Sequence, residues 1–459
     1  MMKLKVFNPY SNDLISELVC DSKETIKKKL TASSKNTHIP NAEERSKILK
    51  NAAEIIVTER ENIANLISSE SGLSIKDTLY EVDRVVNVAR YSSVVANLIE
   101  IDITKEFIYG NSNSPTLEVI TEPKKLVIGI TPFNHPMNQV AHKVFPAIAA
   151  GANIIIKPSE KTPLSALKLR EILINAGMPE NMFHIILAVN PNEALCDILM
   201  HKDIEMVSFT GGLEVGLTIQ KSMVDSGHGL TKFVPELGGS SSLIVCSDAN
   251  IDRAVDITIN GCFKNSGQRC TAIRRVVIEN KIKKEFEEKL LKKMQDYTYG
   301  DPSVDEMGTV IDEEACIKIK ERINSAVNYG AKVIFGGNRN GAFIEPTILN
   351  DIDLKMEIVS KETFGPVCPI ISTKNFEESL LIAKSTSYRL AGAIVTKDIF
   401  KAKKAADFLQ VGQFNFNAHP GYRSELAPFG GFGNSGNGEK EGVLLAARSM
   451  RNIRTFYSH

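Results

Sequence analysis

The chain has 459 residues, of which 43% are hydrophobic and 24% are charged, and its 55 basic residues balance 55 acidic ones. This length exceeds what one hydrophobic core usually serves, so we expect two or three domains and exclude a single small domain and a disordered chain. The balanced charge creates no global field that would attract nucleic acid or an anionic membrane, and we expect neither as a partner.

The sequence carries no clear targeting or redox signal. The N-terminal run MMKLKVFNPYSNDL meets polar residues before the apolar core of a signal peptide could develop, and the most apolar stretch, residues 144–156, is too short to span a bilayer. Seven cysteines form an odd set without CxxC spacing, which argues against a disulfide framework and a zinc site. We therefore expect a cytoplasmic protein with reduced thiols and no metal.

In chain order, the first patterned segment is residues 41–67, where apolar residues recur at helical spacing and predict an amphipathic helix. From residue 125 the β-rich runs KLVIGIT, NIIIK, MFHIILA and EMVSFT are separated by segments of helix length. This alternation favours parallel strands with crossover helices, and Pro163 and Gly177 mark the start and the end of one such helix. The pattern predicts a dinucleotide-binding sheet.

A second alternating block follows Cys270. The run RRVVIE predicts a strand, residues 281–296 and 313–329 predict amphipathic helices, and AKVIFGG and AGAIVT predict later strands. We expect a separate α/β domain here. Residues 101–122 and the terminal TFYSH have no helical period, and both are candidates for oligomerisation strands.

Cys270 stands in KNSGQRCTAIRR, a polar turn between a helical segment and a strand. A guanidinium beside the sulfur, together with backbone N–H groups at a turn, would favour the thiolate, which attacks carbonyl carbon. The alternative is a buried, inert thiol, and this interpretation suits Cys246 and Cys262 because they lie in apolar runs.

Glu236 stands in KFVPELGGSSS, between a β-rich run and two glycines that allow close approach of the backbone to a ligand or another segment. A carboxylate flanked by Val234, Pro235 and Leu237 would be costly to bury unless it were paired or functional. From these residues alone, a catalytic carboxylate and a salt bridge at the end of a strand both stay open.

Two loops that follow predicted strands could meet a phosphate or a ribose. The turn VSFTGG places Gly211 and Gly212 before a helix, whose first N–H groups attract anions. The spacing is not GxGxxG, so a plain strand–helix turn is the alternative. Lys157, Ser159 and Glu160 follow another strand, at the edge where parallel sheets bind ligands, and solvated loop charges are the alternative here.

The motifs TPFNHP, KPSEKTP, VSFTGG, ELGG, GQRC, ETFGP and PFGGFGNSG occur in this order. Together with the spacing of Glu236 and Cys270, they resemble the aldehyde dehydrogenase superfamily over nearly the whole chain. The resemblance implies an α/β fold and a homodimer or homotetramer. The implied regions are a Rossmann-like dinucleotide-binding domain (1–100 and 123–236), an α/β catalytic domain (237–430), and a small β oligomerisation element with the tail (101–122 and 431–459).

The resemblance also assigns catalytic roles. It implies that Cys270 is the nucleophile, which forms a thiohemiacetal and then a thioester, and that Glu236 activates the water that hydrolyses the thioester. Asn134 and the backbone N–H of Cys270 would form the oxyanion hole. The presence of Glu236 favours a carboxylate product over a CoA thioester.

The implied cofactor is NAD(P). The residues that would hold it are Thr131, Pro132, Phe133, Lys157, Ser159, Glu160, Gly211, Gly212, Glu362 and Phe364. Glu160 offers a carboxylate to a ribose hydroxyl and would repel a 2′-phosphate, which favours NAD over NADP.

Four side chains map to the mouth of the family's substrate tunnel, namely Arg84, His135, Arg269 and Arg423. Guanidinium groups bind phosphate-like oxygens through paired hydrogen bonds, whereas a neutral aldehyde would leave these charges unpaired. We therefore expect a small anionic aldehyde as the substrate. For each arginine alone, a surface ion pair is the alternative.

Within the family, these residues resemble the branches that oxidise phosphonoacetaldehyde and, without phosphorylation, glyceraldehyde-3-phosphate. The histidine after Asn134 and the run HPGYRSELAPFGG favour phosphonoacetaldehyde. Sulfoacetaldehyde, lactaldehyde and succinic semialdehyde stay open, as does an inactive binding or structural protein with this fold. The sequence departs from the family in PFGGFGNSG, which lacks a common lysine, and in FTGG, which replaces FTGS.

Overall fold

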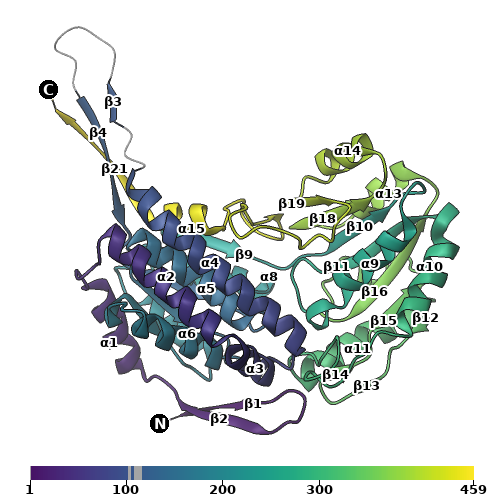
Figure 1. The fold of residues 1–459 in the computed structure, drawn as a ribbon, viewed down its shortest axis with the longest axis horizontal. Helices are drawn as coiled ribbons and strands as arrows, with labels where there is room; N and C mark the ends of the chain where they lie inside the picture. The colour runs from purple at the N-terminus through teal and green to yellow at the C-terminus, as the bar shows by residue number, and fades with distance from the viewer. Residues whose placement is uncertain (1, 102–104, 108–115, 459) are drawn as a thin grey trace.

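The computed structural model describes residues 2–101, 105–107 and 116–458. Two larger sheets, each flanked by helices, lie next to each other, and a smaller antiparallel sheet projects from the N-terminal part (Figure 1). The predicted α/β fold class is confirmed. Within the predicted oligomerisation segment 101–122, residues 102–104 and 108–115 lie outside the described residues.

The first sheet is parallel and forms where the sequence predicts alternating strands and crossovers. Its order is β7-β6-β5-β8-β9. The strands are β5 (Val127–Ile130), β6 (Ile154–Lys157), β7 (Phe183–Ile185), β8 (Met206–Thr210) and β9 (Lys232–Glu236). The chain runs outward from β5 to β7 and then returns to β8 beside β5. Ligands bind at such a switch point, outside the carboxyl ends of the strands.

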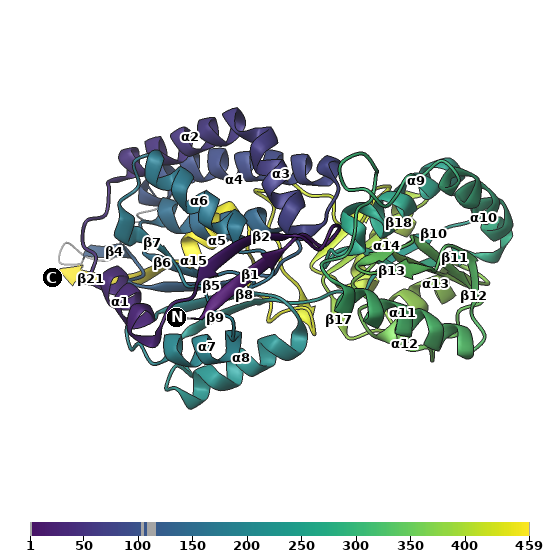
Figure 2. The same ribbon diagram turned by 90° about the horizontal axis from the view of Figure 1, so that it is seen from below.

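Helices cover both faces of this sheet (Figure 2). The helices are α1 (Lys23–Ser34), α2 (Ala42–Thr58), α3 (Arg60–Ser71), α4 (Ile75–Ile101), α5 (Pro136–Ala150), α6 (Leu164–Asn175), α7 (Pro191–Leu199) and α8 (Leu213–Asp225). On one face α2 to α6 bury a large apolar cluster that includes Leu49 and Phe145, and on the other α1, α7 and α8 contribute Leu30 and Ile198. None of the helices described is both long and apolar enough to cross a membrane.

The helix predicted over residues 41–67 is two helices. Before α2, Asn41 and Glu44 form a reciprocal capping box. The helix ends at Thr58, and Glu59 adopts φ −95° and ψ 14° before α3 begins. The apolar spacing stays in phase across this break and neither Gly nor Pro marks it, so the hydrophobic pattern does not reveal it.

The second sheet has the order β12-β15-β16-β11-β10-β18-β19, and only β12 runs antiparallel to its neighbour. Its strands are β10 (Ser241–Val245), β11 (Ile273–Glu279), β12 (Lys332–Phe335), β15 (Thr347–Asn350), β16 (Val367–Thr373), β18 (Ala391–Val395) and β19 (Gln413–Phe416). The helices around it are α9 (Ile251–Cys262), α10 (Asn280–Met294), α11 (Glu313–Asn328), α12 (Glu357–Ser360), α13 (Phe376–Ala383) and α14 (Ile399–Leu409). The predicted strands RRVVIE and AGAIVT are β11 and β18, and the predicted helices are α10 and α11.

The projecting sheet joins the end of the chain to the segment between α4 and β5 (Figure 1). Its order is β21 (Arg451–Ser458), β4 (Thr116–Pro123) and β3 (Lys105–Phe107). The shorter elements are β1 (Lys3–Phe7), β2 (Leu14–Val19), β13 (Arg339–Asn340), β14 (Phe343–Ile344), β17 (Tyr388–Arg389), β20 (Phe432–Gly433), α15 (Val443–Ser449), η1 (Glu180–Met182) and η2 (Lys264–Gly267). The domain boundaries given by the sequence stay predictions.

Candidate active site

The nucleophile loop connects α9 to β11 through the 3-10 turn η2. In this turn Asn265 and Ser266 have φ of 60° and 51°. Such left-handed conformations are costly for residues other than glycine and persist where surrounding contacts hold them. Here the Asn265 backbone N–H donates to Asp77 Oδ2 at 2.6 Å, and its side-chain amide donates to the Asn134 carbonyl at 2.9 Å. These bonds fix the backbone that leads to Cys270.

Asn134 lies beside the same loop. Its side chain is buried, and its Nδ2 donates to the Gln268 carbonyl at 2.8 Å. An amide nitrogen carries two protons, so one N–H remains for a ligand. Asn134 and Cys270 line the same two cavities, which brings the predicted amide donor to the predicted nucleophile.

Glu236 ends β9 and is only 2% exposed. Neither carboxylate oxygen has a hydrogen-bond partner among the described residues, and no ion pair at the end of the strand is formed there. Burial raises the pKa of this carboxyl well above its usual range, and the neighbouring carboxylate of Glu441 raises it further. A Cβ on Gly430 would lie 2.6 Å from Glu236 Oε1, so the absence of a side chain at Gly430 provides the space for this carboxylate.

Near Glu236 lies a buried ion pair that the sequence analysis did not find. Lys143 Nζ donates to Glu441 Oε1 and to Ser208 Oγ, both at 2.7 Å. Burial raises the pKa of Glu441, but the charge and hydrogen bond of Lys143 outweigh burial and lower it below its ordinary value. Glu441 is therefore ionised, and its negative charge acts on Glu236.

The arginine beside Cys270 is not sufficient to make its sulfur a thiolate. Burial raises its pKa to about 11, and the carboxylates of Glu362 and Glu236 act in the same direction, whereas two arginines of the cavity lower it. Arg269 turns its Nη2 to backbone carbonyls of α9. The predicted effect of the guanidinium has the expected direction, since Arg269 lowers the pKa of Cys270, but burial outweighs it and the sulfur rests as a thiol.

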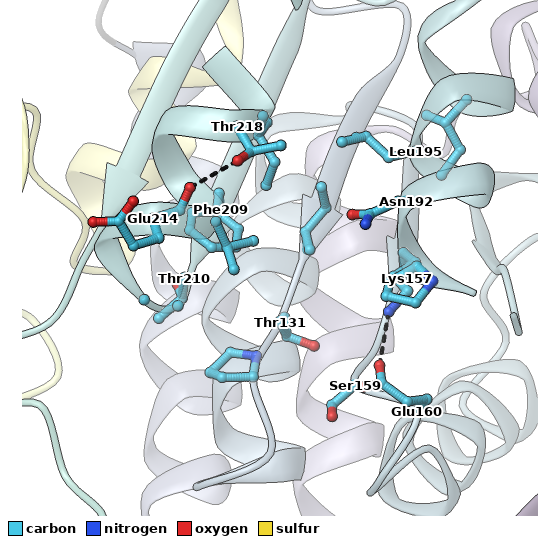
Figure 3. A pocket seen from close by; sticks show the side chains of 18 residues that line it. Thr131, Lys157, Ser159, Glu160, Asn192, Leu195, Phe209, Thr210, Glu214 and Thr218 are labelled. Carbon is cyan, nitrogen blue, oxygen red and sulfur yellow. Dashed lines mark hydrogen bonds and ion pairs between the residues drawn. The ribbon is translucent and has the colours of Figure 1, made fainter. Parts of the chain in front are cut away.

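A cleft of about 490 Å³ lies at the switch point of the first sheet (Figure 3). The predicted cofactor residues that line it are Thr131, Pro132, Lys157, Ser159, Glu160, Gly211 and Gly212. Lys157 Nζ lies 3.2 Å from Glu160 Oε2, and Figure 3 shows this pair across the cleft from Glu214 and Thr218 of α8.

This cleft fits a dinucleotide. The hydroxyls of Thr131 and Thr210 are buried and have no hydrogen-bond partner among the described residues, and the first N–H groups of α8 have no partner within the helix. A Cβ on Gly212 would meet nothing within 4 Å, so the turn before α8 is open to a ligand. The cleft shares Pro132, Thr210, Gly211 and Gly212 with a cavity of about 290 Å³ whose lining includes Phe133, Glu236, Cys270, Glu362 and Phe364. A long ligand can therefore extend from the sheet to the sulfur.

Glu362 lies against the two glycines of ELGG. The Gly239 N–H donates to Glu362 Oε1 at 3.1 Å, and a Cβ on Gly238 would lie 2.2 Å from Glu362 Oε2. The rings of Phe133 and Phe364 meet edge to face with their centroids 5.9 Å apart. The two glycines thus contact Glu362, one of the predicted cofactor residues.

The four predicted substrate residues line one cavity with Cys270 and Asn134. His135 Nδ1 lies 3.3 Å from Glu81 Oε2. Arg423 stacks on the Phe429 ring at 4.0 Å, and its buried Nη1 has no partner among the described residues. The structure therefore brings these four side chains together, but it pairs some of them with protein groups.

Glu425 is the main acidic partner that the sequence analysis missed. It accepts hydrogen bonds from Arg84 at 2.6 and 3.1 Å and approaches His142 Nε2 at 2.8 Å. Although burial raises its pKa, His142 and Arg84 hold that pKa far below the usual range. The charge of Arg84 is therefore balanced inside the protein.

Tyr80, Lys264 and His419 also line the mouth without a signal in the sequence analysis. The Nδ1 of His419 is buried and has no hydrogen-bond partner in the part of the chain that the structure describes. Burial, followed by the charges of Arg269 and Lys264, lowers its pKa to about 3. His419 is therefore a neutral imidazole, which offers hydrogen bonding without charge.

A model of the aldehyde dehydrogenase family matches residues 2–456. The chain therefore belongs to the aldehyde dehydrogenase family, and the predicted enzyme class, an NAD(P)-dependent oxidoreductase, is confirmed at the level of the family. The match covers both larger sheets and the projecting one.

Known relatives resemble the chain over most of its length. It is 33% identical to the lactaldehyde dehydrogenase of Methanococcus maripaludis (strain C5), over 99% of this chain and 97% of the relative. It is 34% identical to the sulfoacetaldehyde dehydrogenase of Neptuniibacter caesariensis, over 90% and 89%. A solved structure of betaine aldehyde dehydrogenase from Staphylococcus aureus in complex with NAD+ is 30% identical, covers 100% of this chain and 91% of its own, and has a TM-score of 0.93.

Proposed function

We propose that this protein oxidises a small anionic aldehyde to its carboxylate with NAD(P), through a thiohemiacetal and a thioester on Cys270. The observation that carries the proposal is a narrow cavity of about 60 Å³, in which Cys270 and Asn134 share the wall with Arg84, Arg269 and Arg423. A nucleophile and an amide donor suit attack on a carbonyl, and guanidinium groups suit an anionic group at the far end of a short chain.

The names of two relatives support an acidic or hydroxylated short aldehyde, since one is a sulfoacetaldehyde dehydrogenase and the other a lactaldehyde dehydrogenase. Phosphonoacetaldehyde, which the sequence favours, differs from sulfoacetaldehyde only in its tetrahedral oxyanion. We propose a short aldehyde with a sulfonate or a phosphonate. Glyceraldehyde-3-phosphate, lactaldehyde and succinic semialdehyde are the alternatives.

In the first step the Cys270 sulfur attacks the carbonyl carbon. The thiol must lose its proton first, because burial holds its pKa at about 11. Glu236 lines the same cavity with both oxygens free, and it is the base that takes this proton. As the C–S bond forms, the carbonyl oxygen gains negative charge, which the free N–H of Asn134 and the backbone N–H of Cys270 stabilise.

NAD(P), when bound, supplies the acceptor for the hydride that leaves the thiohemiacetal carbon. Lys157, Ser159 and Glu160 would hold its adenosine ribose, Gly211 and Gly212 its pyrophosphate, and Thr131, Pro132, Phe133, Glu362 and Phe364 its nicotinamide end. The Glu160 carboxylate favours NAD over NADP, because a 2′-phosphate would meet a like charge.

Hydrolysis of the thioester needs a base for the attacking water. A carboxylate whose pKa is raised by burial is a stronger base than an exposed one, so Glu236 suits this role. Glu236 first releases to solvent the proton that it took from Cys270, so that it is ionised again. It then takes a proton from water, the water oxygen attacks the thioester carbon, and the C–S bond breaks. The carboxylic acid leaves and the Cys270 sulfur is regenerated.

A substrate screen tests the proposal. Reduction of NAD and of NADP is followed by absorbance with sulfoacetaldehyde, phosphonoacetaldehyde, glyceraldehyde-3-phosphate, lactaldehyde, succinic semialdehyde and neutral propanal. We expect kcat/KM for the sulfonate or the phosphonate to exceed that for propanal by about tenfold or more, because hydrogen bonds to charged groups discriminate at least this strongly. Similar values for charged and neutral aldehydes would contradict the proposed substrate class.

The same assay separates an enzyme from an inactive binding protein. Cys270→Ala should abolish NADH formation while NAD still binds, and Cys196→Ala, at an exposed thiol, should leave the rate unchanged. If no aldehyde gives NADH with the unaltered protein, a binding or structural role is favoured instead.

Two expectations about the protein in the cell stay proposals. We propose a homodimer or homotetramer, which the exposed apolar side chains of the edge strand β21, Ile453 and Phe456, support. Light scattering after size exclusion tests it. The cytoplasmic location inferred from the sequence also stays a prediction.

A further inference from the structure

The substrate mouth contains a cation to which the sequence analysis gave no role. Lys264 begins η2 and lines the cavity that also contains Cys270 and Arg423. Its ammonium lies 3.6 Å from the centre of the Tyr80 ring and 4.0 Å from Asp77 Oδ1. The face of an aromatic ring attracts a cation, and the protons of the ammonium that point away from the ring stay available to an acceptor. The ammonium of Lys264 is therefore positioned at the mouth.

The cationic side chains of the mouth differ in how many of their N–H donors already form hydrogen bonds within the protein. Arg84 gives two hydrogen bonds to Glu425, and Arg269 gives hydrogen bonds to backbone carbonyls. Lys264 Nζ, in contrast, has only the longer ion pair with Asp77 at 4.0 Å, and Arg423 Nη1 is buried without a hydrogen-bond partner among the described residues. A ligand binds uncommitted donors at lower cost, because no existing bond has to be broken.

The surroundings of Lys264 also favour an anion. Burial lowers the pKa of its ammonium, and the guanidinium groups of Arg269 and Arg84 lower it further, while Asp77 raises it. The carboxylate of Asp77 is partly committed elsewhere, because it accepts the Asn265 N–H at 2.6 Å. An anion at the mouth would relieve the repulsion among these cations.

We propose that Lys264 is a further specificity-determining residue, which binds the anionic end of the aldehyde together with Arg423. This inference rests on the proposed oxidation of an anionic aldehyde. The ammonium and the free guanidinium N–H provide several donors to one cavity, which suits a tetrahedral group with several acceptor oxygens, such as a sulfonate or a phosphonate. A neutral aldehyde offers no acceptor to them beyond its carbonyl.

The test compares Lys264→Met with Lys264→Arg, which keeps the charge, and with Lys284→Met, at a side chain that is 92% exposed. For each variant kcat/KM is measured with sulfoacetaldehyde, phosphonoacetaldehyde and propanal. We expect Lys264→Met to lower kcat/KM for the two anions by about tenfold, chiefly through KM, and that for propanal less than about twofold. Lys264→Arg and Lys284→Met should retain the preference for anions.

A structural role for Lys264 predicts a different result, in which all three aldehydes lose activity together and the melting temperature falls. That result, or an unchanged preference in Lys264→Met, overturns the inference. Should Lys264→Met not fold, Lys264→Gln is measured in its place, and calorimetric binding of sulfoacetate to the variant and the unaltered protein gives a second readout. If the unaltered protein itself does not prefer the anions to propanal, the proposed function fails and the inference with it.

Discussion

Burial and pairing, rather than residue type alone, set the charge of each residue in the site. Glu236 is a carboxyl with a raised pKa because it is buried without a partner, whereas Glu441 is ionised because Lys143 bonds to it. Arg84 is balanced by Glu425. The cavity beside the cofactor cleft thus contains a carboxyl suited to proton transfer, and the substrate cavity keeps only part of its positive charge for a ligand.

The effect of the Glu441 charge on the pKa of Glu236 can be tested by measuring how kcat depends on pH. Glu236 acts as a base only when ionised, so a raised pKa shifts the rise of kcat towards higher pH. Glu441→Gln removes the repelling charge and leaves the Lys143 ammonium unpaired, and both changes lower the pKa of Glu236. We expect the rise of kcat to move to lower pH, as measured from steady-state profiles.

The matched control for this experiment is Glu439→Gln, at a half-exposed carboxylate that pairs with Lys232. Its profile should follow that of the unaltered enzyme. A profile of Glu441→Gln that does not move, or moves to higher pH, would show that Glu236 is not the group that limits kcat.

A short motif around a residue is enough to predict the role of some residues of the site. Cys270 and Asn134 stand in GQRC and TPFNHP, and the structure brings both to one cavity. Pairings between distant segments have no such signal, since Arg84 and Glu425 are 341 residues apart. The raised pKa of Cys270 was also unpredictable, because it depends on burial that the sequence does not specify.

At the scale of elements, the connection from β9 to β10 is where the two larger sheets meet. Its glycines let the backbone pass Glu362, as the contact of Gly239 with that carboxylate illustrates. The nucleophile loop passes the same point, because a Cβ on Gly239 would lie 2.3 Å from the Cys270 carbonyl oxygen. A small side chain here would displace either the nucleophile or the carboxylate.

Gly238→Ala tests this packing. The added methyl would overlap Glu362 Oε2, so we expect that carboxylate to shift and KM for NAD to rise about tenfold, in line with the usual cost of overpacking. KM for the aldehyde should change much less at saturating NAD. Gly229→Ala, whose Cβ would have its nearest neighbour at 3.8 Å, is the control. An unchanged KM for NAD in Gly238→Ala would argue against a cofactor role for Glu362.

The existence and type of most elements could be predicted, but their interruptions could not. The helices predicted in the second block agree with α10 and α11 within a few residues. The break at Glu59 is different, because helical apolar spacing continues through it and only tertiary packing decides where the chain turns. The conformation of η2 likewise depends on Asp77, which belongs to a remote helix.

In the molecule as a whole, the candidate site lies between the two larger sheets. The first sheet and its helices contribute Asn134 and Glu236, and the second contributes Cys270 and Glu362. Neither sheet alone contains a complete set of reacting groups. Alternation of strands and helices predicts each sheet, but the way they meet depends on contacts far apart in sequence.

The proposed function depends on one step, in which an acyl group is transferred to Cys270 and then released by water that Glu236 activates. It is tested most directly by mass spectrometry of Glu236→Gln after reaction with NAD and sulfoacetaldehyde at about pH 9, where loss of the carboxylate also favours the thiolate. The account predicts one acyl group on the Cys270 peptide for each NADH formed, and none on Cys196. NADH formation without an adduct on Cys270 would contradict it.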